Sequence, residues 1–193
     1  MPDAIYFIAI LVEGEAGETI TGFKAYAAQH FGASRALNSP PHLTLIPPFS
    51  WPAAQLEVLS GSLSGFMALH PSPAIRLLNF NCFPPHVIYV DVEPNPDLDS
   101  FQHALETHLE QQLSIRTDRE YGFHPHVTIA FKDLREAIFP QAWQYFSAQT
   151  FAHAFQAQGI ALLQHTGQSW EVKQAFYGMN ISKILYFYPK LLL

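Results

Sequence analysis

Two short segments of the sequence pair a histidine with a threonine two residues later. They are His42–Leu45 (HLTL) and His126–Ile129 (HVTI), and each follows a proline. Side chains of a β-strand alternate between its two faces, so each segment offers an imidazole and a hydroxyl on one face and aliphatic side chains on the other. Such a strand can line a cleft with its polar face and anchor itself in the core with its apolar face.

These residue types suit the cleavage of a phosphodiester. In-line displacement at phosphorus needs a base that activates the incoming oxygen and an acid that protonates the departing oxygen. Two imidazoles across a cleft can divide these roles, because the ordinary pKa of histidine lies near neutrality. Threonine hydroxyls can donate hydrogen bonds to the non-bridging oxygens without adding buried charge.

The elements that must position these segments alternate between strand and helix. Short apolar runs predict strands, and apolar residues at helical spacing predict helices. The predicted strands cover residues 5–12, 42–46, 74–83, 87–92, 126–131, 151–163 and 169–177, and the predicted helices cover 17–31, 52–69, 97–113 and 133–148.

The two halves of the chain share the order β-α-β-α-β. The separation of Ile5 from His42 in the first half is close to that of Val87 from His126 in the second. We therefore predict an α+β fold made of one domain, residues 1–193, with two related lobes of about 1–83 and 84–193. Two mainly antiparallel sheets would form a central cleft with helices outside, and the C-terminal strands could cross between the lobes.

Composition narrows the class of partner. Apolar residues make up 49% of the chain and charged residues 13%, which excludes a disordered protein. Ten Lys and Arg residues are scattered in a chain of net charge −6, so a long duplex nucleic acid is not expected as partner, whereas a small nucleotide or an RNA end is.

The sequence contains no apolar run long enough to span a membrane and opens without a basic stretch, so we expect a cytoplasmic protein with no membrane partner. We expect a monomer, with dimerisation through the apolar tail 184–193 as the alternative.

The paired segments resemble the H-x-T-x signature of the two-histidine phosphoesterase superfamily, which includes the 2′-5′ RNA ligase and cyclic phosphodiesterase families. Prolines 40–41 and 47–48 around the first segment, and His124–Pro125 before the second, resemble the usual surroundings of that signature. The resemblance spans nearly the whole chain, because the two-lobed plan matches as well.

The resemblance implies an enzyme that needs neither metal nor cofactor. Its reaction would be hydrolysis of a 2′,3′-cyclic or 1″,2″-cyclic phosphate, or the joining and cleavage of 2′-5′ linkages in nucleotides or RNA ends. By match of position, His42 and His126 would be the acid and the base, in an order that stays open. Thr44 and Thr128 would contact the phosphate.

Three further residues are candidates for binding the substrate. Lys132 stands just after the second segment, where ligase-like members of the superfamily tend to have Arg, and a lysine can meet a phosphate as a point charge. Phe49 and Tyr121 flank the two segments and could stack on a base or ribose, with core packing as the alternative for each.

Two other functions are compatible with the sequence. The protein could be a non-catalytic module that binds nucleotides or RNA ends in the same cleft. It could also be a metal enzyme with His42, His124 and His126 as ligands. No Asp or Glu stands beside these histidines in the sequence, and a metal site would leave both threonines without a role.

Overall fold

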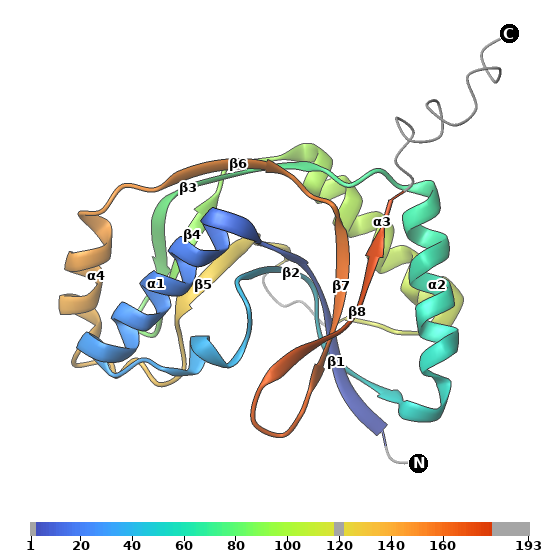
Figure 1. The fold of residues 1–193 in the computed structure, drawn as a ribbon, viewed down its shortest axis with the longest axis horizontal. Helices are drawn as coiled ribbons and strands as arrows, with labels where there is room; N and C mark the ends of the chain where they lie inside the picture. The colour runs from blue at the N-terminus through green and yellow to red at the C-terminus, as the bar shows by residue number, and fades with distance from the viewer. Residues whose placement is uncertain (1–2, 118–121, 179–193) are drawn as a thin grey trace, which may run out of the picture.

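The computed structural model describes residues 3–117 and 122–178, and within them eight strands form one strongly curled antiparallel sheet (Figure 1). The strand order across this sheet is β6-β3-β4-β5-β2-β1-β7-β8. The α+β class is confirmed. The strands are β1 (Asp3–Leu11), β2 (His42–Pro52), β3 (Ala74–Phe83), β4 (Val87–Val92), β5 (His126–Ala130), β6 (Ala152–Gln156), β7 (Gly159–His165) and β8 (Trp170–Tyr177).

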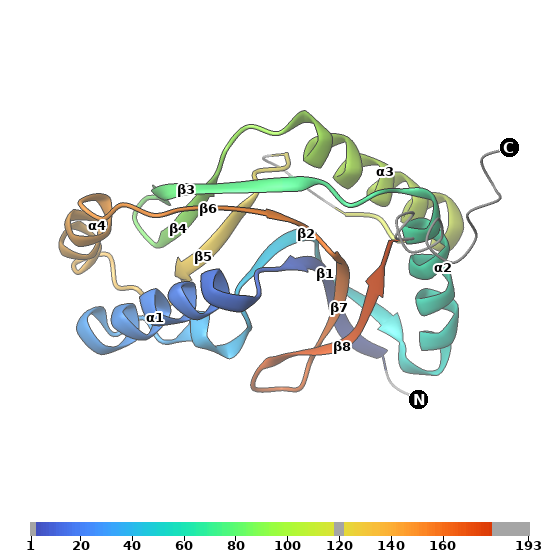
Figure 2. The same ribbon diagram turned by 45° about the horizontal axis from the view of Figure 1, so that its top comes forward.

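Four α-helices accompany the sheet within the described residues, and two short 3-10 helices lie around β2. The α-helices are α1 (Gly14–Phe31), α2 (Leu56–Leu69), α3 (Pro96–Leu113) and α4 (Phe139–Ser147), and the 3-10 helices are η1 (Arg35–Asn38) and η2 (Ala53–Gln55). Helices α1 and α4 lie together at one end of the molecule, and α2 and α3 lie together at the other (Figures 1 and 2). None of the helices in residues 3–117 and 122–178 is long and apolar enough to cross a membrane.

Local signals mark the end of helix α1 and the beginning of helix α3. Helix α1 stops at Gly32, whose φ of 72° lies in the left-handed region that glycine adopts without strain. Helix α3 begins after Asn95, whose side chain accepts hydrogen bonds from the backbone N–H groups of Asp97 and Leu98.

The two motif strands join the halves of the sheet to each other. Strands β2 and β5 are paired through one Cα pair, Leu43 with Val127. Strand β3 pairs with β4 and β6, whereas β7 crosses to the other half and pairs with β1. The structure thus has one sheet where two were predicted, and the β-α-β-α-β repeat of two separate lobes is not confirmed.

Strand β2 is longer than predicted, because Pro47 and Pro48 do not end it. Ile46 pairs with Ile8 and Phe49 pairs with Tyr6, so the two prolines stand opposite a single residue of β1. Prolines are tolerated in sheets at such bulges, where their missing N–H group is not needed for pairing.

Two predictions near the C-terminus were wrong in their boundaries. The helix predicted at 133–148 shortens to α4, with turns and bends before it. The strand predicted at 151–163 is divided into β6 and β7, which pair in different halves of the sheet. Gly159 opens β7 where an added Cβ would lie 2.0 Å from the carbonyl oxygen of Phe176, so only glycine fits there.

The strand β1 separates a large core from a small one. Tyr6, Ile8 and Ile10 belong to the main core together with the helices. The intervening residues Phe7 and Ala9 belong to a small cluster on the opposite face, which also contains two residues of β7 and against which Trp170 packs.

Two predictions from the sequence lie outside the described residues. They are Tyr121 as a substrate contact and the tail 184–193 as a dimer contact.

Candidate functional site

The pair Leu43–Val127 places the polar side chains of both motifs on one face of the sheet. Both aliphatic side chains are fully buried in the main core. Alternation along the strands then turns His42 and Thr44, and likewise His126 and Thr128, to the opposite face. When the register is continued from Leu43–Val127, His42 stands opposite Thr128 and Thr44 stands opposite His126. Each imidazole therefore has a hydroxyl across the strand boundary as well as one on its own strand.

Both motif histidines make the same hydrogen bond. Nδ1 of His42 lies 2.7 Å from the carbonyl oxygen of Pro40, and Nδ1 of His126 lies 2.7 Å from the carbonyl oxygen of His124. A carbonyl oxygen can only accept, so we assign the proton of each neutral ring to Nδ1. This leaves Nε2 of each ring as the nitrogen that can take up or deliver a proton.

His42 lies in an apolar environment. Its ring centroid is 4.8 Å from that of Phe7, and Phe7 makes an edge contact with Trp170 at 4.7 Å. Burial lowers the pKa of His42 to about 4. The hydrogen bond to Pro40 opposes this shift, while the positive charges of Lys24 and a protonated His126 lower the pKa further.

His126 lies among other aromatic rings and close to a carboxylate. Its centroid is 4.8 Å from Tyr89 and 5.4 Å from Phe83. The pKa of His126 is lowered, chiefly by burial and further by the charge of a protonated His124, while the hydrogen bond to the His124 carbonyl and the carboxylate of Asp91 oppose this shift. Asp91 is the register partner of His126 on β4. The two histidines therefore differ in their surroundings, since among the described residues a carboxylate raises the pKa of His126 and none raises that of His42.

A cavity of about 690 Å³ opens over this face of the sheet. It brings together four of the predicted site residues, His42, Thr44, Thr128 and Lys132. His126 is not among its lining residues, and its ring packs instead in the cluster with Tyr89. The remaining lining residues are Phe7, Arg35, Ala36, Asn38, Ser39, Pro48, Phe131, His165, Gly167, Gln168 and Trp170.

Phe49 lies on the other face of the sheet. Its ring packs against the main core and lies 6.4 Å from the ring of Tyr6, its partner on β1. Phe49 therefore packs against the core, which was the alternative to substrate binding, and we do not include it in the site.

Arg35, a cation at the same cavity, was not predicted from the sequence. The backbone N–H groups of Ser34 and Arg35 donate to Oδ2 of Asp133, at 2.8 and 2.9 Å, so the turn η1 is tied to the segment that follows β5. Both Arg35 and Lys132, the neighbour of Asp133, are exposed and line the cavity. The available signal was a lone cation between the first predicted helix and the first motif, in a chain with few cations.

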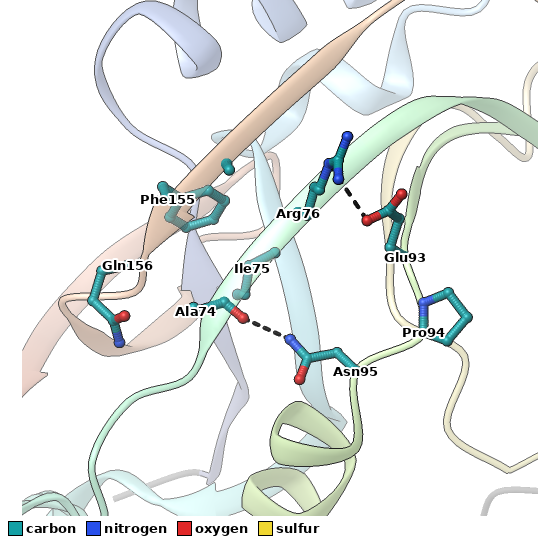
Figure 3. A pocket seen from close by; sticks show the side chains of 9 residues that line it. Ala74, Ile75, Arg76, Glu93, Pro94, Asn95, Phe155 and Gln156 are labelled. Atoms are coloured by element: carbon teal, nitrogen blue, oxygen red, sulfur yellow. Dashed lines mark hydrogen bonds and ion pairs between the residues drawn. The ribbon is translucent and has the colours of Figure 1, made fainter.

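A second cavity, of about 390 Å³, lies beside β3 and β6 (Figure 3). Its cation, Arg76, forms an ion pair of 3.4 Å with Glu93, and Asn95 donates to the carbonyl oxygen of Ala74 (Figure 3). No histidine of the described residues lines this cavity. It therefore lacks the acid-base pair that the first site offers.

Metal ligation was the competing interpretation of the histidines. Within residues 3–117 and 122–178, no three His, Cys, Asp or Glu side chains are grouped to hold a metal ion. His124 is exposed, and its Nε2 lies 3.2 Å from the hydroxyl of Tyr89.

Comparison with known protein families gives a match over most of the chain. Residues 13–169 match the family model described as the 2′-5′ RNA ligase superfamily. A Geobacillus kaustophilus protein named as a phosphoesterase is 29% identical over 140 residues, which cover 71% of this chain and 78% of that protein. A similarly named protein of Bacillus cytotoxicus is 29% identical over 141 residues, covering 72% of this chain and 78% of the relative.

Solved structures share the fold at lower identity. Escherichia coli LigT in complex with 3′-AMP is 17% identical with a TM-score of 0.64, covering 93% of this chain and 100% of that one. The Thermus thermophilus protein TT0787 is 18% identical with a TM-score of 0.61, covering 91% and 100%.

Proposed function

The chain belongs to the 2′-5′ RNA ligase superfamily, the two-histidine phosphoesterases, and on that basis we propose that it is a phosphodiesterase acting on a small nucleotide or an RNA end. The bond cleaved would be a 2′,3′-cyclic or 1″,2″-cyclic phosphate ester or a 2′-5′ linkage. The observation that carries this proposal is the Leu43–Val127 pair, which turns two imidazoles and two hydroxyls to one face of the sheet.

The hydrolytic step uses the free Nε2 atoms. One ring accepts a proton from water through Nε2 while the water oxygen attacks phosphorus. The P–O bond to the departing ribose oxygen breaks, and the other ring delivers its Nε2 proton to that oxygen. The product is a phosphate monoester, and the two rings have exchanged protonation states. The Thr44 and Thr128 hydroxyls donate to the non-bridging oxygens, whose negative charge grows in the transition state.

The surroundings of the two rings support an order of roles. His42 stands in the apolar half of the site and remains neutral at pH 7, so it is the base. Burial also lowers the pKa of His126, but the carboxylate of Asp91 opposes that shift and no carboxylate of the described residues does so for His42, so we assign His126 as the acid. A bound phosphodiester anion raises the pKa of both rings and brings them closer to neutrality.

The cavity suits a nucleotide. Phe7 and Trp170 give it an apolar aromatic wall beside His42, on which a base or ribose can pack. Arg35 and Lys132 give it cations for negatively charged oxygens beyond the reacting phosphorus. The relative LigT has been solved with 3′-AMP, with NADP+ and with phosphate, which is consistent with a substrate of this class.

One observation favours a second candidate, a module that binds nucleotides without cleaving them. His126 does not line the 690 Å³ cavity, and an acid and a base act together only when both reach the substrate. A binding module would use Thr44, Thr128, Arg35 and Lys132 and leave His126 without a chemical role.

A substrate screen separates these functions. The purified protein is incubated with 2′,3′-cyclic nucleotides, ADP-ribose cyclic phosphate and 2′-5′ dinucleotides, each with and without EDTA. We expect product from at least one of them, at the same rate in EDTA. Binding without product in every case would favour the second candidate, and a rate abolished by EDTA and restored by a metal ion would contradict the metal-independent mechanism.

A further inference from the structure

A buried lysine lies directly behind the first motif. Lys24 of α1 is 2% exposed and occupies the apolar stripe of its helix, between Ile20 and Ala27. Two ion pairs are found among the described residues, Arg76–Glu93 and Arg116–Glu110, and neither includes Lys24. Glu171 of β8 lines the same cavity of about 280 Å³ as Lys24 but forms no ion pair with it. A buried ammonium group that no carboxylate pairs with is costly, so its presence calls for a reason.

The hydrogen bonds of Lys24 lead to His42. Nζ of Lys24 donates to the carbonyl oxygen of Ser39 at 3.1 Å. The next carbonyl, of Pro40, accepts from Nδ1 of His42 at 2.7 Å, and the one after it, of Pro41, accepts from the backbone N–H of Val12 at 2.9 Å. Three successive carbonyls thus each receive one donor, and the middle donor is the motif histidine.

This arrangement restrains the Ser39–Pro41 segment on both sides of the bond to His42. Proline cannot donate a backbone hydrogen bond, so the segment depends on its carbonyl groups for attachment. Val12, the residue that follows β1, holds the Pro41 end, and Lys24 of helix α1 holds the Ser39 end. The orientation of the Pro40 carbonyl, and with it the direction in which Nε2 of His42 points, depends on both attachments.

The ammonium group also acts on His42 through its charge. Burial lowers the pKa of Lys24 to about 8, so the side chain is still mostly protonated at pH 7. The groups whose charge shifts the pKa of His42 are Lys24 from α1 and a protonated His126 from β5, and both lower it. Other titratable or charged residues that line the 690 Å³ cavity with His42 are Arg35, Lys132 and His165. Phe7, which packs on the His42 ring, is uncharged.

We propose that Lys24 is a positioning residue for His42, which fixes the imidazole through the Ser39–Pro41 carbonyls and whose charge adds to the effect of burial in disfavouring a protonated ring. The catalytic role of Lys24 rests on the proposed function, whereas its effect on the orientation and pKa of the His42 ring does not. Lys24 has no ion-pair partner among the described residues, and its Nζ donates to the carbonyl that directly precedes the acceptor of His42 Nδ1.

Two variants separate the hydrogen bond from the charge. Lys24→Gln keeps a donor for Ser39 and removes the charge, whereas Lys24→Met removes both at similar length. Lys173→Met is the matched control, since Lys173 is an exposed lysine of β8 that does not line the cavity. We expect Lys24→Met to keep or raise the melting temperature, because a buried charge is replaced by an apolar side chain.

The decisive readout is the NMR titration of the His42 ring protons, assigned with His42→Asn. We expect the pKa of His42 to rise by about half a unit or more in both Lys24 variants and to stay at its wild-type value in Lys173→Met. On an active substrate we expect kcat to fall on the order of tenfold in Lys24→Met, less in Lys24→Gln, with KM little changed.

An unchanged His42 titration in both Lys24 variants would overturn the proposal, as would a Lys24→Met protein with a lowered melting temperature and wild-type kcat. If the wild-type protein cleaves none of the phosphodiesters, the proposed function fails, while the titration still decides whether Lys24 controls the imidazole.

Discussion

Asp91 is the register partner of His126 across β4 and β5, whereas the partner of His42 across β1 and β2 is Leu11. One imidazole thus faces a carboxylate and the other an aliphatic side chain. A carboxylate stabilises a protonated ring, and an apolar neighbour favours the neutral one. On this difference rests our proposal that the two side chains have opposite roles in proton transfer.

Replacement of Asp91 tests this division of roles. In Asp91→Asn the negative charge that raises the pKa of His126 is lost, so the acid deprotonates at lower pH. We expect the alkaline limb of the kcat/KM profile to move down by about half a unit to one unit. The control is Asp3→Asn, because Asp3 also accepts from a side chain, Ser50, but lies away from the cavity. An alkaline limb that does not move would contradict the assignment of His126 as the acid.

The two threonines have a simple isosteric test. Thr44→Val and Thr128→Val keep shape and strand preference but remove the donor to the non-bridging oxygens. We expect each to lower kcat/KM on the order of 10- to 1000-fold, mostly through kcat, with little change in melting temperature. Thr19→Val, on the exposed surface of helix α1, serves as control. A wild-type kcat in either motif variant would remove that hydroxyl from the mechanism.

The attachment of η1 predicts an effect on binding. Asp133→Ala removes the acceptor of the Ser34 and Arg35 N–H groups, so Arg35 loses its fixed position at the cavity. We expect a several-fold rise in KM with kcat largely retained, together with a loss of about 1 kcal/mol in the free energy of unfolding. Equal KM values for the wild type and this variant, measured on the same nucleotide, would show that binding does not depend on the attachment of η1 to Asp133.

Acid should destabilise the protein through His42. Its pKa is about 4 in the folded state and 6.5 ordinarily, so the unfolded chain binds more protons between these values. The free energy of unfolding therefore falls as pH drops from 6.5 to 4, by up to about 3 kcal/mol and less to the extent that water reaches the ring. The free energy of unfolding, measured with urea at several pH values in this range, should depend less steeply on pH for His42→Asn than for the control His103→Asn. The histidine of the control is exposed on α3. The same pH dependence of the free energy of unfolding in both variants would mean that His42 is not buried as a neutral ring.

The features that could be predicted from the sequence are local ones. Apolar spacing located helix α1, and Gly32 marked its end. The alternation of polar and aliphatic residues in His42–Leu45 and His126–Ile129 predicted the face on which each side chain lies, because alternation is a property of the strand itself. The structure agrees, since His42 and both threonines lie on the face opposite the buried Leu43 and Val127.

The features that could not be predicted depend on partners distant in the chain. Strands β6 and β7 form one continuous run in the sequence, and only their pairing with β3 and with β1 separates them. Phe49 was expected at the substrate because it flanks the first motif beyond a strand predicted to end at Ile46, whereas the bulge continues the strand and pairs Phe49 with Tyr6. Lys24 interrupts an apolar helical stripe, and this was a visible signal, but its link to His42 runs through Ser39 and required coordinates.

The central claim is that two imidazoles, one from each motif strand, act together on one phosphorus. The most direct measurement is kcat/KM on a cleaved cyclic nucleotide, in EDTA, for the wild type, His42→Ala, His126→Ala and the double variant. We predict a loss of at least about 1000-fold in each single variant and no substantial further loss in the double variant, because the rings work as a unit. A wild-type rate in either single variant that folds normally would contradict the claim.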